Sequence, residues 1–78
     1  MPSLTARKHS DVAAVIRAAR EDAELTQAEL AERLSFPRDY MVDLEAAKPN
    51  LYMTRLFRTL HELGITITLD YGDDDADA

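Results

Sequence analysis

The 78 residues of this chain carry a formal net charge of −6 at pH 7, and they include no cysteine and only two glycines. A chain of this length forms one small domain with a marginally stable core, which leaves no room for a catalytic cleft on a separate scaffold and favours dimerisation. The composition excludes disulfides and cysteine-based zinc sites and offers no nucleophile–base pair or phosphate-binding glycine loop, so we expect neither an enzyme nor a bound metal or cofactor.

Negative charge is concentrated at the C-terminus of the chain. The last nine residues carry five aspartates, so residues 1–69 have a net charge of only −1. Because neutralisation of phosphates drives non-specific affinity for nucleic acid, the overall charge disfavours such a partner, and its uneven distribution weakens that objection. No apolar run approaches membrane-spanning length and the N-terminus lacks a signal-peptide core, so we expect a cytoplasmic protein without membrane contact.

The first predicted elements are an arm and a helix. Residues 1–9 show no apolar periodicity, which predicts a flexible N-terminal arm. Ser10 is a suitable N-cap residue for the helix that follows, because its hydroxyl can accept from a first-turn amide. Apolar side chains then recur at positions i, i+3, i+4 and i+7, the spacing of a buried helical face. These side chains are Val12, Val15, Ile16 and Ala19.

A second helix is predicted to start after Thr26. Thr26 and Glu29 match a capping box, in which the Thr hydroxyl accepts from the Glu amide and the Glu carboxylate accepts from the Thr amide. The helix carries Leu30, Ala31 and Leu34 on one face, which indicates that this face packs on the core.

Residues 35–37, Ser-Phe-Pro, interrupt the helical pattern and predict a tight turn. Pro37 suits the first turn of a following helix, where its missing amide hydrogen costs nothing. Met41 and Leu44, three residues apart, give this short helix a buried side. A helix, a three-residue turn and a short second helix are the components of a helix-turn-helix, whose second helix enters the major groove of DNA.

Near its C-terminus the chain changes from helical to strand periodicity. An apolar stripe predicts a last helix that closes at Gly64, a common C-terminal stop. Residues 65–69, ITITL, alternate apolar and Thr side chains, as a strand does. A lone strand in a helical chain has unpaired edges, so we expect it to pair with the same strand of a second copy. Residues 70–78 are predicted to form an acidic disordered tail. The apolar stripe of the last predicted helix consists of Met53, Leu56, Phe57, Leu60 and Leu63.

The chain resembles the lambda-repressor-like (XRE/Cro-repressor) helix-turn-helix family. It carries L-T-Q-x-E-L-A-x-x-L at 25–34, an apolar residue at 36, then Arg38, Met41 and L-E at 44–45. The resemblance extends from about residue 12 to about residue 64 and implies a helix-turn-helix DNA-binding domain at 10–64. The implied fold is mainly α, a small four-helix domain with one short C-terminal β-strand that pairs in a homodimer.

The resemblance implies DNA contacts from both helices and from the turn after them. Gln27 matches a glutamine that commonly contacts a phosphate and braces the recognition helix. Arg38 matches a position that reads a base or a phosphate, and arginine suits a bidentate grip on guanine. Lys48, just past the recognition helix, is an expected phosphate contact.

Three residues of the predicted recognition helix depart from the choices that the family usually makes. Asp39, Tyr40 and Asp43 occupy positions where the family more often has Gln, Thr, Ser, Asn or Arg. A carboxylate repels phosphate but can accept from cytosine N4, and a tyrosine can donate to a phosphate or cover a thymine methyl. For Asp39 a second interpretation stays open, because an acidic side chain also stabilises the positive end of the helix dipole. All three remain candidate DNA contacts.

Arg20 and Glu45 match a different feature of the family, a partly buried ion pair. In phage repressors this pair ties the first helix to the end of the recognition helix. We therefore interpret both residues as structural, and their loss would affect DNA binding indirectly.

The end of the chain resembles HipB-type antitoxins, in which a helix, L-G and a short apolar–Thr strand complete the domain. This resemblance implies a homodimer joined by its C-terminal strands, repression of its own operon through an inverted-repeat operator, and binding to a HipA-like kinase toxin. The expected dimer contacts are Leu60, Leu63, Ile65, Ile67 and Leu69.

Two alternatives stay open at the level of sequence. One is a stand-alone XRE-type regulator without a toxin partner. The other is a protein-interaction module that has kept the helix-turn-helix fold and lost DNA binding. Asp39, Asp43 and the acidic tail favour the interaction module, whereas Gln27, Arg38 and Lys48 oppose it.

Overall fold

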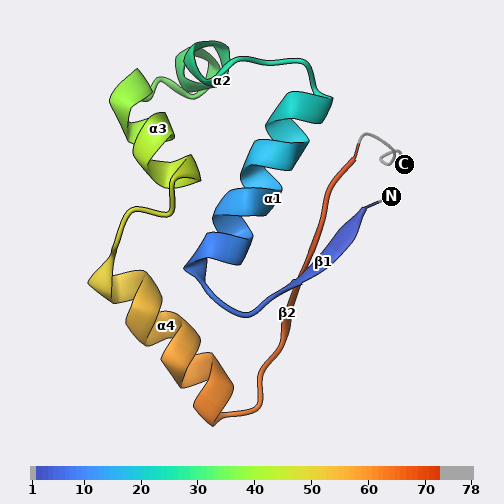
Figure 1. The fold of residues 1–78 in the computed structure, drawn as a ribbon, viewed down its shortest axis with the longest axis vertical. Helices are drawn as coiled ribbons and strands as arrows, with labels where there is room; N and C mark the ends of the chain where they lie inside the picture. Colours follow the sequence, from blue (N-terminus) through green and yellow to red (C-terminus); the bar gives the residue numbers. More distant parts are fainter. Residues whose placement is uncertain (1, 73–78) are drawn as a thin grey trace.

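Four helices and two short strands make up residues 2–72, the part of the chain that the computed structural model describes. The predicted mainly helical class is therefore confirmed. Helix α1 contacts α3, α4 and the first strand, so it forms the centre of the fold. Figure 1 shows α2 and α3 beside one end of α1, α4 beside the other end, and the two strands along its opposite side. In chain order the elements are β1 (Ser3–Ala6), α1 (His9–Asp22), α2 (Gln27–Leu34), α3 (Arg38–Glu45), α4 (Leu51–Glu62) and β2 (Ile67–Asp70).

The buried core is small and takes one or two side chains from each helix. Met41 of α3 is its largest fully buried side chain, and Phe57 is the core contribution of α4. Three small residues allow the elements around them to approach closely, namely Ala6, Ala13 and Ala31. Two predicted core positions, Ile16 and Met53, are half-buried, and Leu34, which was predicted to face the core, is exposed.

The predicted capping box at the start of α2 is confirmed. The Thr26 hydroxyl accepts from the Glu29 amide at 3.0 Å, and the Glu29 carboxylate accepts from the Thr26 amide at 2.8 Å. The prediction for α1 was less accurate, because that helix begins at His9, with Lys8 rather than Ser10 as its N-cap residue. There the Asp11 carboxylate accepts from the Lys8 amide at 3.2 Å, which fixes the first turn.

The C-terminal strand finds its partner within the chain, so the prediction that it has none is wrong. Strand β2 pairs antiparallel with β1, with Leu4 opposite Leu69 and Ala6 opposite Ile67. The half-buried side chains of Ile67 and Leu69 lie on the same face of the sheet as Leu4 and Ala6, because side chains alternate along each strand. The monomer therefore supplies apolar neighbours to this face, which had been assigned to a dimer core.

Two segment predictions need correction as a consequence. Residues 1–9, predicted as a flexible arm, contain β1 at Ser3–Ala6 and the first residue of α1. The acidic tail was predicted to begin at residue 70, but Asp70 lies in β2 opposite Ser3. The Tyr71 amide continues the ladder by donating to the Pro2 carbonyl at 3.3 Å. The rest of the predicted tail, residues 73–78, lies outside the described residues.

Candidate nucleic-acid interface

Helices α2 and α3 are joined by a turn that fixes the angle between them. Ser35 adopts a left-handed conformation (φ 60°), and the Phe36 amide donates back to the Ala31 carbonyl at 2.8 Å. Pro37 then stands as the N-cap residue of α3, one position before the first-turn site predicted for it. Because Ala31 and Met41 are both buried, each of the two helices is fixed on the core by its inner face.

The outer face of α3 gathers the side chains that were predicted to read DNA. Arg38, Asp39 and Tyr40 are all exposed in the first turn of the helix, and Asp43 is half-buried one turn later. These side chains are therefore accessible together around the solvent side of α3, and of these side chains only Asp43 has an ion-pair partner among residues 2–72, namely Lys48. Such a face offers the guanidinium and phenol donors that a DNA groove requires.

Phe36 belongs to the same surface, although sequence reasoning noted it only as an apolar residue of the turn. Its ring lies 5.2 Å from the ring of Tyr40 in an edge-to-face arrangement, and both rings are substantially exposed. The contact restricts where the Tyr40 hydroxyl can point. Phe36 precedes the N-cap residue Pro37, so the helical spacing rule gave no signal for this contact.

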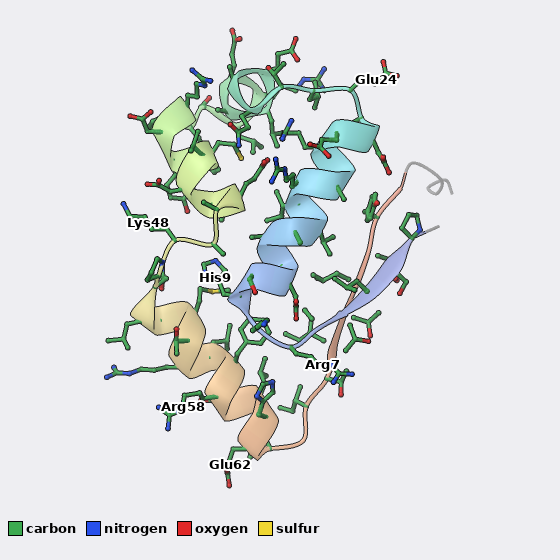
Figure 2. The ribbon with its side chains drawn as sticks, viewed as in Figure 1. Arg7, His9, Glu24, Lys48, Arg58 and Glu62 are labelled. Atoms are coloured by element: carbon green, nitrogen blue, oxygen red, sulfur yellow. The ribbon has the colours of Figure 1, made fainter. Side chains whose placement is uncertain are left out.

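Lys48 lies in the connection between α3 and α4, and Figure 2 shows it projecting outward from this loop. Its ammonium group is 3.4 Å from the Asp43 carboxylate. The Lys48 side chain is 68% exposed and the Asp43 side chain 50% exposed, so this ion pair contributes little to stability. A phosphate would meet Lys48 with its charge partly compensated by Asp43.

The predicted ion pair between Arg20 and Glu45 is present and largely buried. The Arg20 guanidinium donates through Nε to Glu45 Oε2 at 2.6 Å and through Nη2 to Oε1 at 3.0 Å. The side chains are 10% and 3% exposed, respectively. Because Arg20 belongs to α1 and Glu45 is the last residue of α3, the pair ties the central helix to α3.

The pair has a clear effect on the titration of Glu45. The hydrogen bonds from Arg20 lower the pKa of Glu45 below its ordinary value, and burial opposes this shift. A hydrogen bond from Gln27 lowers the pKa of Glu45 as well. Gln27 Nε2 donates to Glu45 Oε1 at 3.1 Å, so Gln27 does brace α3, as the resemblance implied, and Glu45 is the acceptor that the sequence did not name.

The predicted dimer contacts divide into two groups. Leu63 and Ile65, which lie between α4 and β2, are 67% and 47% exposed. Ile67 and Leu69 are half-buried on the face that they share with β1, and Leu60 of α4 is half-buried too. The exposed apolar residues of the connection therefore adjoin a strand whose second edge has no backbone partner among residues 2–72.

Among residues 2–72, no group of three or more His, Cys, Asp or Glu side chains could hold a metal ion. None of the helices in this part of the chain is long and apolar enough to cross a membrane.

The arrangement can be compared with known proteins. A protein of Sinorhizobium fredii (strain NBRC 101917 / NGR234), named as the uncharacterized HTH-type transcriptional regulator y4mF, is 33% identical over 60 residues. The similar stretch covers 77% of this chain and 79% of that relative. No protein-family model matches the chain, and no solved structure gives a significant match.

Proposed function

This chain belongs to the HTH-type transcriptional regulators, and we propose that it represses transcription as a homodimer bound to an inverted-repeat operator. The observation that carries the proposal is the outer face of α3. Arg38, Asp39 and Tyr40 are exposed together on a helix whose inner face is fixed to the core by Met41. A short helix held in this way can enter the major groove without rearrangement of the fold.

The proposed homodimer forms through the free edge of β2. Because the Tyr71 amide bonds to Pro2, the ladder alternation places the hydrogen bonds to β1 at residues 67, 69 and 71. The backbone groups of Thr68 and Asp70 then point to the other edge. Antiparallel pairing of Thr68 with Thr68 of a second copy would build a four-stranded sheet. It would also place Asp70 opposite Thr66 rather than opposite another carboxylate.

A two-fold axis at this position has consequences for the operator. It places Leu63 and Ile65 of both copies beside the junction, where their exposed apolar surface loses contact with water. A dimer of helix-turn-helix domains binds half-sites about 34 Å apart, one turn of B-DNA. An inverted repeat with that spacing is the expected operator.

We also propose that the regulator is the antitoxin of a HipA-like kinase toxin and represses its own operon. The support is the resemblance of residues 60–69 to HipB-type antitoxins. The competing proposal within the class is a stand-alone XRE-type regulator. Pull-down with the product of the adjacent open reading frame distinguishes them, since only an antitoxin retains a kinase-fold protein.

The alternative from another class is a protein-interaction module without DNA binding. The acidic side chains of Asp39 and Asp43 favour the interaction module. Asp43 also partly neutralises Lys48, a candidate phosphate contact. A mobility-shift assay on the DNA upstream of the chain's own gene decides between the two. A specific shift that unlabelled operator competes away, and unrelated DNA does not, supports the repressor; no shift at any salt concentration supports the interaction module.

Arg38→Ala is expected to weaken specific operator binding by about 1–3 kcal/mol, because it removes the one cation in the first turn of α3. The loss should depend on which base occupies the contacted position. Fluorescence anisotropy with a set of single-base operator variants measures both effects. Equal losses on every variant would assign Arg38 to a phosphate instead of a base.

Lys48→Ala is expected to weaken binding to all DNA sequences alike. The slope of log affinity against log salt concentration should become shallower by about one unit, since one phosphate contact fewer releases about one counterion fewer. Titrations at several salt concentrations, on operator and on random DNA, test this. Glu62→Gln, at the end of α4, is the control for a charge change away from the interface, and an unchanged salt slope in Lys48→Ala would remove Lys48 from it.

A further inference from the structure

The side chain of Gln27 is tied to the far end of the helix-turn-helix before any DNA is bound. Gln27 is the first residue of α2, and its amide nitrogen donates to Glu45, the last residue of α3, at 3.1 Å. The two residues are 18 positions apart in the sequence. The hydrogen bond therefore closes α2 and α3 into one unit at the helix end that was predicted to contact a phosphate.

Glu45 is itself fixed, so it can serve as an anchor for Gln27. Its Oε1 atom accepts from both Gln27 and Arg20, and its Oε2 atom accepts from Arg20 at 2.6 Å. The remaining terminal nitrogen of the guanidinium donates to the Leu25 carbonyl at 2.7 Å. Leu25 lies two residues before Gln27, so Arg20 holds both the carboxylate and the backbone that leads into α2.

The chemistry of the carboxylate determines how the Gln27 amide is oriented. An ionised carboxylate only accepts hydrogen bonds, so it engages Gln27 through the NH₂ group and never through the carbonyl oxygen. The contacts with Arg20 keep the pKa of Glu45 low, which maintains this ionised state near neutral pH. The amide nitrogen has two hydrogens, and one remains after the bond to Glu45 is made.

We propose that Glu45 is a positioning residue for DNA binding, which holds the Gln27 amide so that its second N–H donates to a backbone phosphate. The inference rests on the proposed function, since it requires DNA at the start of α2. Its physical basis is preorganisation: the side chain is ordered in the free protein, so binding does not incur that entropy cost. The ion pair thereby acts on affinity as well as on stability.

A double-mutant cycle on operator affinity tests the proposal. Gln27→Ala should lower affinity about tenfold or more, the usual size for a hydrogen bond to a charged group. In the Glu45→Leu background the same substitution should change affinity by less than about twofold, because leucine has no oxygen to accept from the amide. Glu32→Leu, at an exposed carboxylate of α2, is the matched control and should leave the full effect of Gln27→Ala intact.

A measurement without DNA separates the positioning role from a purely structural one. Gln27 and Asn50 are the only residues of the chain with a side-chain amide, so the pair of NH₂ resonances that Gln27→Ala removes belongs to Gln27. In the free wild-type protein they should lie apart from those of an unrestrained glutamine and exchange slowly with water. They should move to the unrestrained position in Glu45→Leu and stay in place in Glu32→Leu.

The outcomes distinguish the two proposals. If the wild type binds its operator and the losses from Gln27→Ala and Glu45→Leu are additive, the positioning role is wrong and the repressor proposal stands. If the wild type binds no DNA, both are wrong. If Glu45→Leu does not fold, the wild-type resonances decide, because an unrestrained Gln27 amide in the free protein overturns the inference.

Discussion

Arg20→Met is expected to destabilise the domain more than any other single substitution of a charged residue. The methionine leaves the Glu45 carboxylate, 3% exposed, without its cation. A buried charge that loses its partner costs about 3–5 kcal/mol, a large part of the free energy of unfolding of a domain of this size. Urea denaturation followed by circular dichroism measures the loss as a shift of the midpoint at unchanged slope.

The exposed pair Arg17–Glu21 provides the matched control. It joins neighbouring turns of α1 at 3.5 Å, with side chains 63% and 58% exposed. Arg17→Met should therefore cost less than about 1 kcal/mol. A double-mutant cycle completes the test, because Arg20→Met combined with Glu45→Leu should cost much less than the sum of the single losses. Additive losses would mean that the two side chains do not interact in solution.

The same pair predicts a change in the pH dependence of stability. Glu45 has a folded-state pKa below its ordinary value of 4.5, so its stabilisation is complete above that value. It is lost as pH falls through the folded-state pKa, since the unfolded chain binds the proton first. In Arg20→Met the burial of Glu45 dominates and raises its pKa above the ordinary value. The contribution of Glu45 to the free energy of unfolding then increases as pH falls, the opposite of its behaviour in the wild type. The destabilisation by Arg20→Met should thus be smaller at pH 4 than at pH 7.

The helix starts could be predicted from the sequence better than the helix ends. Thr26 with Glu29 is a local signal, and so is Asn50, whose side chain caps α4 by accepting from the Met53 amide. Gly64 marked the end of α4 because glycine adopts a positive φ without strain. The end of α2 at Ser35 was predicted as well, from Ser-Phe-Pro at 35–37. Helices α1 and α3 end beside Glu24 and Ala47, non-glycine residues with positive φ, and nothing local distinguishes these two from helix interiors.

Strand β1 was missed for a different physical reason. Ser3–Ala6 alternates polar and apolar side chains, but four residues are too few to separate this pattern from chance. The strand exists because β2 and α1 supply its partners, and β2 follows it by some sixty residues of chain. Tertiary contacts of this kind have no local signature. In the helix-turn-helix the resemblance supplied two of them, the Arg20–Glu45 pair and a glutamine that braces α3, but it did not name Glu45 as the acceptor for Gln27.

Pairing of two copies through the free edge of β2 depends on the backbone amide of Thr68. Thr68→Pro removes an amide that points to the free edge of β2 and leaves the bonds to β1 intact. Across a two-fold axis one substitution removes two hydrogen bonds, each worth about 0.5–1.5 kcal/mol. The dimer dissociation constant should therefore rise about 10-fold to 100-fold. Analytical ultracentrifugation measures this rise, and operator affinity should fall with it because a monomer contacts one half-site.

Two further proline variants decide which edge is used. Ile67→Pro removes an amide that bonds to β1, so it should lower the stability of the monomer itself. Thr5→Pro removes an amide at the opposite, outer edge of the sheet, which the proposed dimer does not use, and should leave the dimer unaffected. If Thr5→Pro weakens the dimer and Thr68→Pro does not, the copies pair through β1. If neither does, then Leu63, Ile65 and the helices make the interface, and the spacing of the two recognition helices no longer follows from the sheet.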